Sequence, residues 1–338
     1  MNPTQQVDAP TLNIPTNHGY GVGTFFTSLF CFLILSISLT AKAASCCGGG
    51  ASSGIILPKF NKAMWDISLA SESYDGFWTQ KGNYQEDPKG SRLLQRRMNL
   101  SYAHRLNDNF QLSSSIAIIN NDNQYSGDHS NVTALGDAQL GIWYEAFENV
   151  TCVYKINGWE SLKPSIYFGG ALTIPTGISP YTDRIDSSFD ITGLGFYRLD
   201  ANMIIEKTVY PYSISWQSQY GYTFKRPINQ EYNQIVTPYT KQLGDRYAHT
   251  LSGAYTWFLK NLSMLTATIS YSELTQKAST IDGIVDDASG MKKTSHGLSF
   301  AYSNAIRDWI FKFNLSRANE GENIPKTNVI GVGVSHVY

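Results

Sequence analysis

The stretch Tyr212–Tyr222, YSISWQSQYGY, alternates between apolar and polar side chains along nearly its whole length. Apart from Ser218, aromatic or aliphatic residues occupy the even-numbered positions, and serine, glutamine or glycine the odd ones. Because successive side chains of a β-strand point to opposite faces, the stretch predicts a strand with one apolar and one polar face. Its length also suits a transmembrane β-strand, which needs about 9–11 tilted residues.

The same alternation recurs beyond Lys62, where no helical period is sustained. About twelve segments carry it, and single-chain bacterial barrels have an even number of strands. The sequence therefore predicts an all-β fold, an antiparallel transmembrane β-barrel of the outer-membrane type with about 12 strands. The predicted strands are Met64–Tyr74, Leu94–Leu106, Phe110–Ile118, Gly136–Phe147, Leu162–Ile174, Gly195–Ile205, Tyr212–Tyr222, Asp245–Trp257, Ser263–Glu273, Ser295–Ser303, Trp309–Arg317 and Thr327–Tyr338.

The connections between these segments alternate in length, as the outer loops and periplasmic turns of such barrels do. Two connections depart from the pattern, since Glu148–Ser161 is long for a turn and Ala318–Lys326 is short for an outer loop. An even strand number places both chain ends on the periplasmic side. The predicted long loops are Asp75–Leu93, Ile119–Leu135, Pro175–Leu194, Thr223–Gly244 and Leu274–Thr294.

A soluble β-sandwich also alternates, so alternation alone does not choose the barrel. The segments are longer than the 5–6 residues usual in globular strands, and tyrosine and tryptophan gather near their ends, as in the aromatic girdles of membrane barrels. An export signal precedes them. Phe25–Leu39 reads FFTSLFCFLILSISL and is followed by a small-x-small site at Ala41–Ala43. These features together favour the barrel.

The same border defines the predicted organisation of the chain. Residues 1–43 are a signal segment cleaved between Ala43 and Ala44, residues 44–62 a flexible periplasmic tail rich in Cys, Gly and Ser, and residues 63–338 the barrel. The signal lacks Lys or Arg before its apolar run, which leaves the true start of translation open. Lipidation at Cys46 is the alternative to cleavage at Ala43.

Composition excludes several classes of function. The formal net charge of −1 gives no basic footprint for nucleic acid. Four cysteines, two of them adjacent at Cys46-Cys47, supply neither a disulfide framework nor the spacing of a zinc site. We therefore expect no metal and no cofactor.

If the apolar parity faces lipid, the opposite parity lines the interior. Its charged residues concentrate in the first six strands, and small hydroxyl residues dominate the next four. The charges have two interpretations, a salt-bridge network that holds strands together or a set of groups that selects solutes, and both can hold at once. The predicted lumen-lining residues are Asp66, Arg97, Arg105, Asp137, Glu145, Arg198, Asp200, Ser213, Ser215, Gln217, Thr250, Thr266, Thr268 and Ser270.

The final segment ends in Tyr338 after apolar residues at alternate positions. It resembles the C-terminal signature that barrel assembly machinery recognises, so Tyr338 is the predicted assembly signal.

An enzymatic barrel is a weaker alternative. His129-Ser130-Asn131 holds residue types of a catalytic triad, but neighbours on a polar loop seldom form one, and the His-x-Ser-Asn-Gly pattern of outer-membrane phospholipases is absent.

Several short motifs resemble an outer-membrane family labelled MetA pathway of phenol degradation. They are GDAQLGIWY at Gly136–Tyr144, LTIPTG at Leu172–Gly177, GLG at Gly193–Gly195, GY at Gly221-Tyr222 and GDR at Gly244–Arg246, in matching order and spacing. The resemblance covers roughly residues 94 to 338. It implies an outer-membrane barrel often called a transporter, sometimes linked to aromatic-compound catabolism, and it brings no binding residues with it.

These observations predict an outer-membrane channel or transporter that passes small polar or aromatic solutes through a narrow lumen. A non-conducting barrel that anchors surface loops for adhesion or phage binding is the main alternative, and an outer-membrane lipase or protease a lesser one. The expected partners are outer-membrane lipid, a small-molecule solute and the barrel assembly machinery. The sequence predicts neither the solute nor the oligomeric state.

Overall fold

The structure is a computed structural model that describes residues 56–58, 61–146, 152–182, 185 and 187–338. The chain divides into one unit of Met1–Ala43 and another of Ala44–Tyr338, and every described residue belongs to the second. The predicted signal segment, its cleavage site at Ala43 and Ala44, and Cys46-Cys47 lie outside the described residues. Among those described, no helix is both long and apolar enough to cross a membrane.

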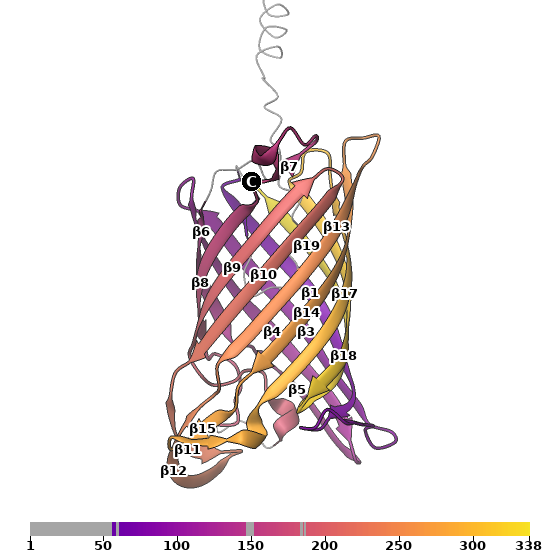
Figure 1. Cartoon of the computed structure of the whole chain (residues 1–338). Coiled ribbons are helices and arrows are strands. Elements are labelled where there is room, and N and C mark those ends of the chain that lie inside the picture. Colours follow the sequence, from indigo (N-terminus) through magenta and orange to yellow (C-terminus); the bar gives the residue numbers. More distant parts are fainter. Residues whose placement is uncertain (1–55, 59–60, 147–151, 183–184, 186) are drawn as a thin grey trace, which may run out of the picture. The chain divides into compact units, whose positions relative to one another are not determined.

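Residues 63–338 form a closed antiparallel barrel of 12 strands (Figure 1). Consecutive strands of the wall are hydrogen-bonded neighbours, and the first and last strands pair to close the ring. This confirms the predicted fold class and strand number. The wall strands are β1 (Ala63–Trp78), β3 (Arg92–Arg105), β4 (Phe110–Tyr125), β6 (Ala138–Glu145), β8 (Ser165–Ile174), β9 (Arg198–Val209), β10 (Tyr212–Thr223), β13 (Arg246–Phe258), β14 (Met264–Gln276), β17 (Met291–Ser303), β18 (Trp309–Glu322) and β19 (Ile324–Val337).

The two faces of the wall differ as the alternation requires. Apolar side chains on one parity are exposed, with Ile269 at 67% and Ile330 at 56% of their full accessible area, whereas Asp66 on the other parity retains 7%. Directly paired residues of neighbouring strands point to the same face, so the register places apolar residues opposite apolar ones. Ile67 pairs with Val334, and Leu69 with Val332. The barrel thus presents apolar side chains outward and polar ones inward, the arrangement of a lipid-facing wall.

Several connections expected as loops contain β-structure. β1 and β4 continue beyond their predicted ends, β5 (Asp128–Leu135) extends the hairpin from β4, and β2 (Tyr84–Gln85) pairs with β1. A separate four-stranded sheet comprises β11 (Arg226–Glu231), β12 (Gln234–Gln242), β15 (Ser279–Ile281) and β16 (Ile284–Asp286), followed by the 3-10 turn η3 (Asp287–Ser289). Figure 1 shows this sheet at the end of the barrel opposite the C-terminus.

In the unusually short connection between β18 and β19, the two strands pair with each other only as far as Arg317 and Asn328, and beyond that point they pair with β17 and β1. Asn323 alone separates β18 from β19 and takes a φ of 52°, a left-handed conformation that asparagine tolerates better than most residues. The predicted loop Ala318–Lys326 is therefore almost entirely strand.

The end of the barrel that carries the C-terminus has shorter connections. The exception, between β6 and β8, holds the two-residue β7 (Cys152–Val153), which runs parallel to β9, and the 3-10 turn η1 (Trp159–Leu162). Leu57, from the segment expected to be a flexible tail, is only 2% exposed and packs with Met64, Ala103 and Val337. Its backbone N–H donates to Gln111 Oε1 at 2.8 Å, so this part of the tail contacts the barrel wall.

Candidate functional site: the inner wall of the barrel

Small polar side chains cover the inner parity of β10, β13 and β14. Register aligns them in rows across the three strands: Gln217, Thr250 and Ser272 form one row, and Ser215, Ser252 and Ser270 the next. In the following row, Ser213 pairs with Ala254 and Ala254 with Thr268. We call these three rows the hydroxyl wall.

Several hydroxyl groups on or beside this wall bond to one another. Thr250 Oγ1 donates to Ser272 Oγ at 3.2 Å, and the hydroxyls of Thr256 and Thr266 are 3.0 Å apart. Ser213 Oγ lies 2.8 Å from Thr208 Oγ1 on β9. A hydroxyl both donates and accepts, so such a wall can exchange these bonds for bonds to a polar solute at modest cost.

At the end of the barrel that carries the C-terminus, the inner charges of β1 and β18 are paired with one another. Asp66 of β1 accepts hydrogen bonds from Lys312 of β18 and from Ser335 of β19, the latter at 2.5 Å. Three neighbouring strands are thereby joined around the closing seam. Lys312 belongs to this site although the sequence analysis did not select it.

Arg105 and Glu145 lie at the same end of the barrel. Arg105 Nε donates to the Asn61 carbonyl at 3.0 Å, its Nη2 to the Pro58 carbonyl at 3.3 Å, and its Nη1 lies 4.0 Å from Glu145 Oε2. The guanidinium therefore fastens the chain that precedes β1 to the wall.

In the half of the barrel away from the C-terminus, Arg198 and Asp200 form a buried bidentate pair on β9. Arg198 Nε lies 2.8 Å from Asp200 Oδ1, and Nη2 lies 3.1 Å from Oδ2. Gly221 stands opposite Asp200 on β10, and a Cβ there would come within 2.5 Å of the carboxylate. Glycine therefore leaves the space that the ion pair occupies.

Beside the pair of Arg198 and Asp200, two inward side chains each have buried polar atoms that form no hydrogen bond with the protein. Arg246 of β13, the register partner of Gly221, buries its Nε without a hydrogen bond, and Asn202 of β9 buries both amide atoms without one. Buried polar atoms normally find a partner in protein or water. These atoms are therefore exceptions to that rule on the inner face of the barrel.

Arg97 and Lys293 complete the charged part of the inner wall. Arg97 donates to Gln95 and lies 3.9 Å from Glu72 Oε2. Lys293 interacts electrostatically with Glu72, Arg246 and Arg97, and within the described chain neither Lys293 nor Arg246 forms an ion pair with a carboxylate. We call Glu72, Arg97, Arg198, Asp200, Arg246 and Lys293 the lumen charge cluster.

Asp137 is used differently from the other predicted lumen residues. It lies between β5 and β6, where its carboxylate accepts the backbone N–H groups of Gly177 at 3.1 Å and Leu194 at 2.9 Å. A Cβ on Gly193 would come within 2.2 Å of Asp137 Oδ1. The GD and GLG motifs thus meet in space, where they hold the loop after β8 against the wall.

The same loop is fastened to the outer sheet. Tyr181 packs edge-on against Phe196 at 5.5 Å between ring centroids, and Arg226 lies 5.3 Å from the Tyr181 ring. Burial, with the nearby Glu231 carboxylate, raises the pKa of Tyr181 to about 12. Its phenol is therefore neutral at physiological pH. The contacts of Tyr181 with Phe196 and Arg226 pack this loop against β11.

Across the described residues, no group of three or more His, Cys, Asp and Glu side chains could hold a metal ion. His129 and Asn131 lie on β5, and His129 Nε2 faces Asp122 Oδ1 at 3.6 Å. Asn131 instead accepts a hydrogen bond from Asn120.

No family model matches the chain, and no curated protein matches it by sequence. Its fold resembles the COG4313 outer membrane channel from Pseudomonas putida F1, with a TM-score of 0.62 and 14% identity over 86% of this chain and 99% of that one. The β domain of the Bordetella autotransporter BrkA aligns over 82% of this chain and all of its own, at 8% identity and a TM-score of 0.44. The KdgM porin in complex with disordered oligogalacturonate aligns over 81% and 99%, at 14% identity and a TM-score of 0.39. At such identities the likeness concerns the fold alone, and the chain has the fold of an outer-membrane β-barrel.

Proposed function

We propose that the protein is an outer-membrane channel that passes small polar or aromatic solutes. One observation carries the proposal: the hydroxyl wall on β10, β13 and β14 belongs to the same closed inner surface as the lumen charge cluster. Small side chains on that wall leave volume, and the charges provide a field that orients a hydrated solute. The COG4313 channel, which has the same fold, is a channel by its description.

Partly unsatisfied atoms support a polar pathway. Arg246 Nε and the amide of Asn202 lie on the inner face without protein partners, which adds to the polar character of the interior. In this proposal, both chain ends lie in the periplasm and the sheet of β11, β12, β15 and β16 lies at the cell surface.

Liposome swelling with sugars, amino acids and phenolic acids tests the channel. We expect permeation through the wild type and slower permeation through Ser215→Trp and Thr268→Trp, because both indoles enter the lumen from the hydroxyl wall. Ile214→Trp and Ile269→Trp are matched controls, since Ile214 and Ile269 are the chain neighbours of Ser215 and Thr268 and are exposed on the lipid face. Absence of permeation through the wild type would favour a barrel that only anchors surface loops.

A further inference from the structure

A polar cluster lies on the outward face of the barrel, at the outer ends of β3, β4 and β5. Below it, the same parity carries apolar side chains: Met98 pairs with Ile118, and Ile118 with Leu135, which is 46% exposed. Two residues further along, the pairing continues as Arg96 with Asn120 and Asn120 with Thr133. We call the set Arg92, Arg96, Asn120, Asp122 and His129 the rim patch.

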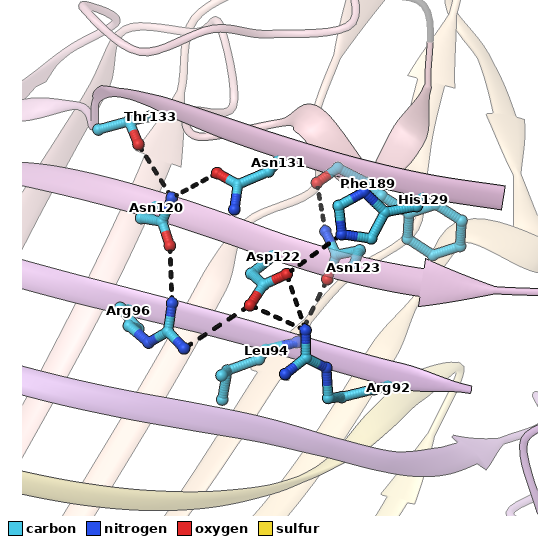
Figure 2. A network of polar contacts seen from close by, with 10 residues as sticks. All are labelled: Arg92, Leu94, Arg96, Asn120, Asp122, Asn123, His129, Asn131, Thr133 and Phe189. Atoms are coloured by element: carbon cyan, nitrogen blue, oxygen red, sulfur yellow. Dashed lines mark hydrogen bonds and ion pairs between the residues drawn. The ribbon is translucent and has the colours of Figure 1, made fainter. Parts of the chain in front are cut away.

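Asp122 organises the cations of the rim patch (Figure 2). Arg92 Nη2 donates to both of its carboxylate oxygens at 3.0 Å, and Arg96 Nη2 lies 3.6 Å from Oδ2. His129 Nε2 approaches Oδ1 at 3.6 Å. One carboxylate thus faces two permanent cations, and the patch keeps an excess of positive charge.

The geometry of the patch is fixed from both sides. Asn120 accepts from Arg96 Nη1 at 3.2 Å and donates to Asn131 and Thr133, each at 2.9 Å. On the inner parity of the same strand, Asn123 donates to the Phe189 carbonyl at 3.0 Å, in the 3-10 turn η2 (Ser188–Asp190). A pre-ordered site loses less entropy on binding than a flexible one.

The arginines keep much of their surface free. The side chains of Arg92 and Arg96 are 57% and 53% exposed, whereas that of Asp122 is 10% exposed. A guanidinium has five N–H donors, and the contacts to Asp122 and Asn120 use only part of them. The remaining donors suit an oxyanion such as phosphate, which arginine binds through paired hydrogen bonds.

The height of the patch matches a lipid headgroup. At about 3.4 Å per residue, Arg96 lies about 7 Å along the strand from Met98, and Arg92 about 20 Å. Arg317 is also outward and exposed. Register places it three strands from Leu94 of β3, on the row Arg317, Asn328, Ser73 and Leu94. At about 4.8 Å per strand, the lateral distance between Arg317 and Leu94 is about 14 Å. These cations border the apolar band on the side away from the chain ends.

We propose that the rim patch binds a phosphate of the lipopolysaccharide headgroup in the outer leaflet of the membrane. Arg92 and Arg96 donate to the phosphate oxygens, and Asp122 keeps the two guanidinium groups together. The acyl chains of the same lipid then lie against Met98, Ile118 and Leu135. The proposal requires the membrane orientation given under the proposed function, but not conduction through the lumen.

The test measures binding of lipid A to the refolded full chain in detergent by native mass spectrometry. For the double variant Arg92→Gln with Arg96→Gln, we expect about a tenfold loss of affinity for bisphosphorylated lipid A. Lys277→Gln with Lys292→Gln is the matched control, because it also removes two outer cations that each pair with one carboxylate, Asp245 or Glu273. Its affinity should equal that of the wild type.

Three further arms define the ligand. Dephosphorylated lipid A, phosphatidylglycerol and inorganic phosphate should each bind the wild type more weakly than bisphosphorylated lipid A. The proposal is wrong if the double variant binds like the wild type, if phosphate removal has no effect, or if phosphatidylglycerol or free phosphate binds as tightly. Heat-modifiable migration on a gel shows whether each variant is folded. If the double variant fails to fold, the single variants Arg92→Gln and Arg96→Gln replace it in the test. Liposome swelling separates the lipid site from the channel, because we expect the double variant to let solutes permeate at the same rate as the wild type.

Discussion

At the scale of single residues, parity decides whether a side chain meets hydrocarbon or the polar interior. Leu140 of β6 is 51% exposed on the outer face of the barrel, whereas Asp200 of β9, on the inner face, is 1% exposed. In soluble proteins this would be inverted, since exposed leucine and buried aspartate both carry a cost. In a membrane barrel the outer apolar surface is stabilised by lipid, and the inner carboxylate by its arginine.

Arginine on the lipid face should therefore be far more costly than arginine on the inner face. We expect Leu140→Arg and Ile269→Arg, near the middle of their strands, to lower the free energy of unfolding by about 2–4 kcal/mol each. Ser215→Arg and Thr268→Arg should fold and instead change the conductance. Urea titrations of protein folded into vesicles measure the first effect. Equal losses on both parities would refute the assignment of faces.

Alternation predicted which residues share a face, but not which charges meet. Arg246 and Lys293 were not selected from the sequence, because Arg246 stands at the start of its predicted strand and Lys293 in the predicted loop Leu274–Thr294. Register brings Arg246 opposite Gly221, beside Asp200. Asp137 lies in the short connection between β5 and β6, on no strand, and its carboxylate binds the backbone of a loop that is 40 residues distant in sequence. Such meetings depend on loop paths that a two-residue period does not encode.

At the scale of elements, the twelve wall strands were predictable because lipid imposes a strict apolar period on their middle sections. Their outer extensions were not, since beyond the bilayer both faces are wet and the period is lost. β5 and the sheet of β11, β12, β15 and β16 consequently appeared as loops. Tyr232 and Asn233, both with positive φ, form the turn between β11 and β12, which marks a hairpin in what was expected to be an irregular connection.

Packing between elements adds constraints that composition does not show. Trp143 was the exception to alternation in its segment, since it lies on the inner parity and is only 2% exposed. Gly169 on β8 stands directly opposite it. A Cβ at Gly169 would meet the indole at 2.5 Å, whereas one at Gly170 would find its nearest neighbour, Ile142 Cγ2, at 3.9 Å. The glycine thus provides the space for the tryptophan.

This contrast between adjacent glycines is testable. We expect Gly169→Ala to destabilise the barrel by about 1–3 kcal/mol through overpacking, and Gly170→Ala to remain within about 0.5 kcal/mol of the wild type. Combining Gly169→Ala with Trp143→Val should restore part of the loss, because the smaller side chain removes the clash. The measurement is again unfolding in vesicles. Similar values for both glycine variants would show that the indole moves aside at little cost.

At the scale of the whole barrel, closure joins local strand pairs into one inner surface with an uneven charge. In the lumen charge cluster, four cations face two carboxylates, and Arg246 and Lys293 are the cations that form no ion pair with a described carboxylate. Lys312, by contrast, is neutralised by Asp66 near the end of the barrel that carries the C-terminus. The field along the lumen should therefore be most positive in its outer half.

That field predicts a preference for anions over cations. Under a KCl gradient across a planar bilayer, the reversal potential of the wild type should indicate anion selectivity, because uncompensated cations raise the local concentration of chloride. Arg246→Gln and Lys293→Gln should each shift it toward cations. Lys292→Gln is a stringent control, since Lys292 directly precedes Lys293 in the chain but faces outward and pairs with Glu273 at 3.2 Å. Equal shifts for Lys292→Gln and Lys293→Gln would mean that surface charge, rather than the lumen charge cluster, sets the selectivity.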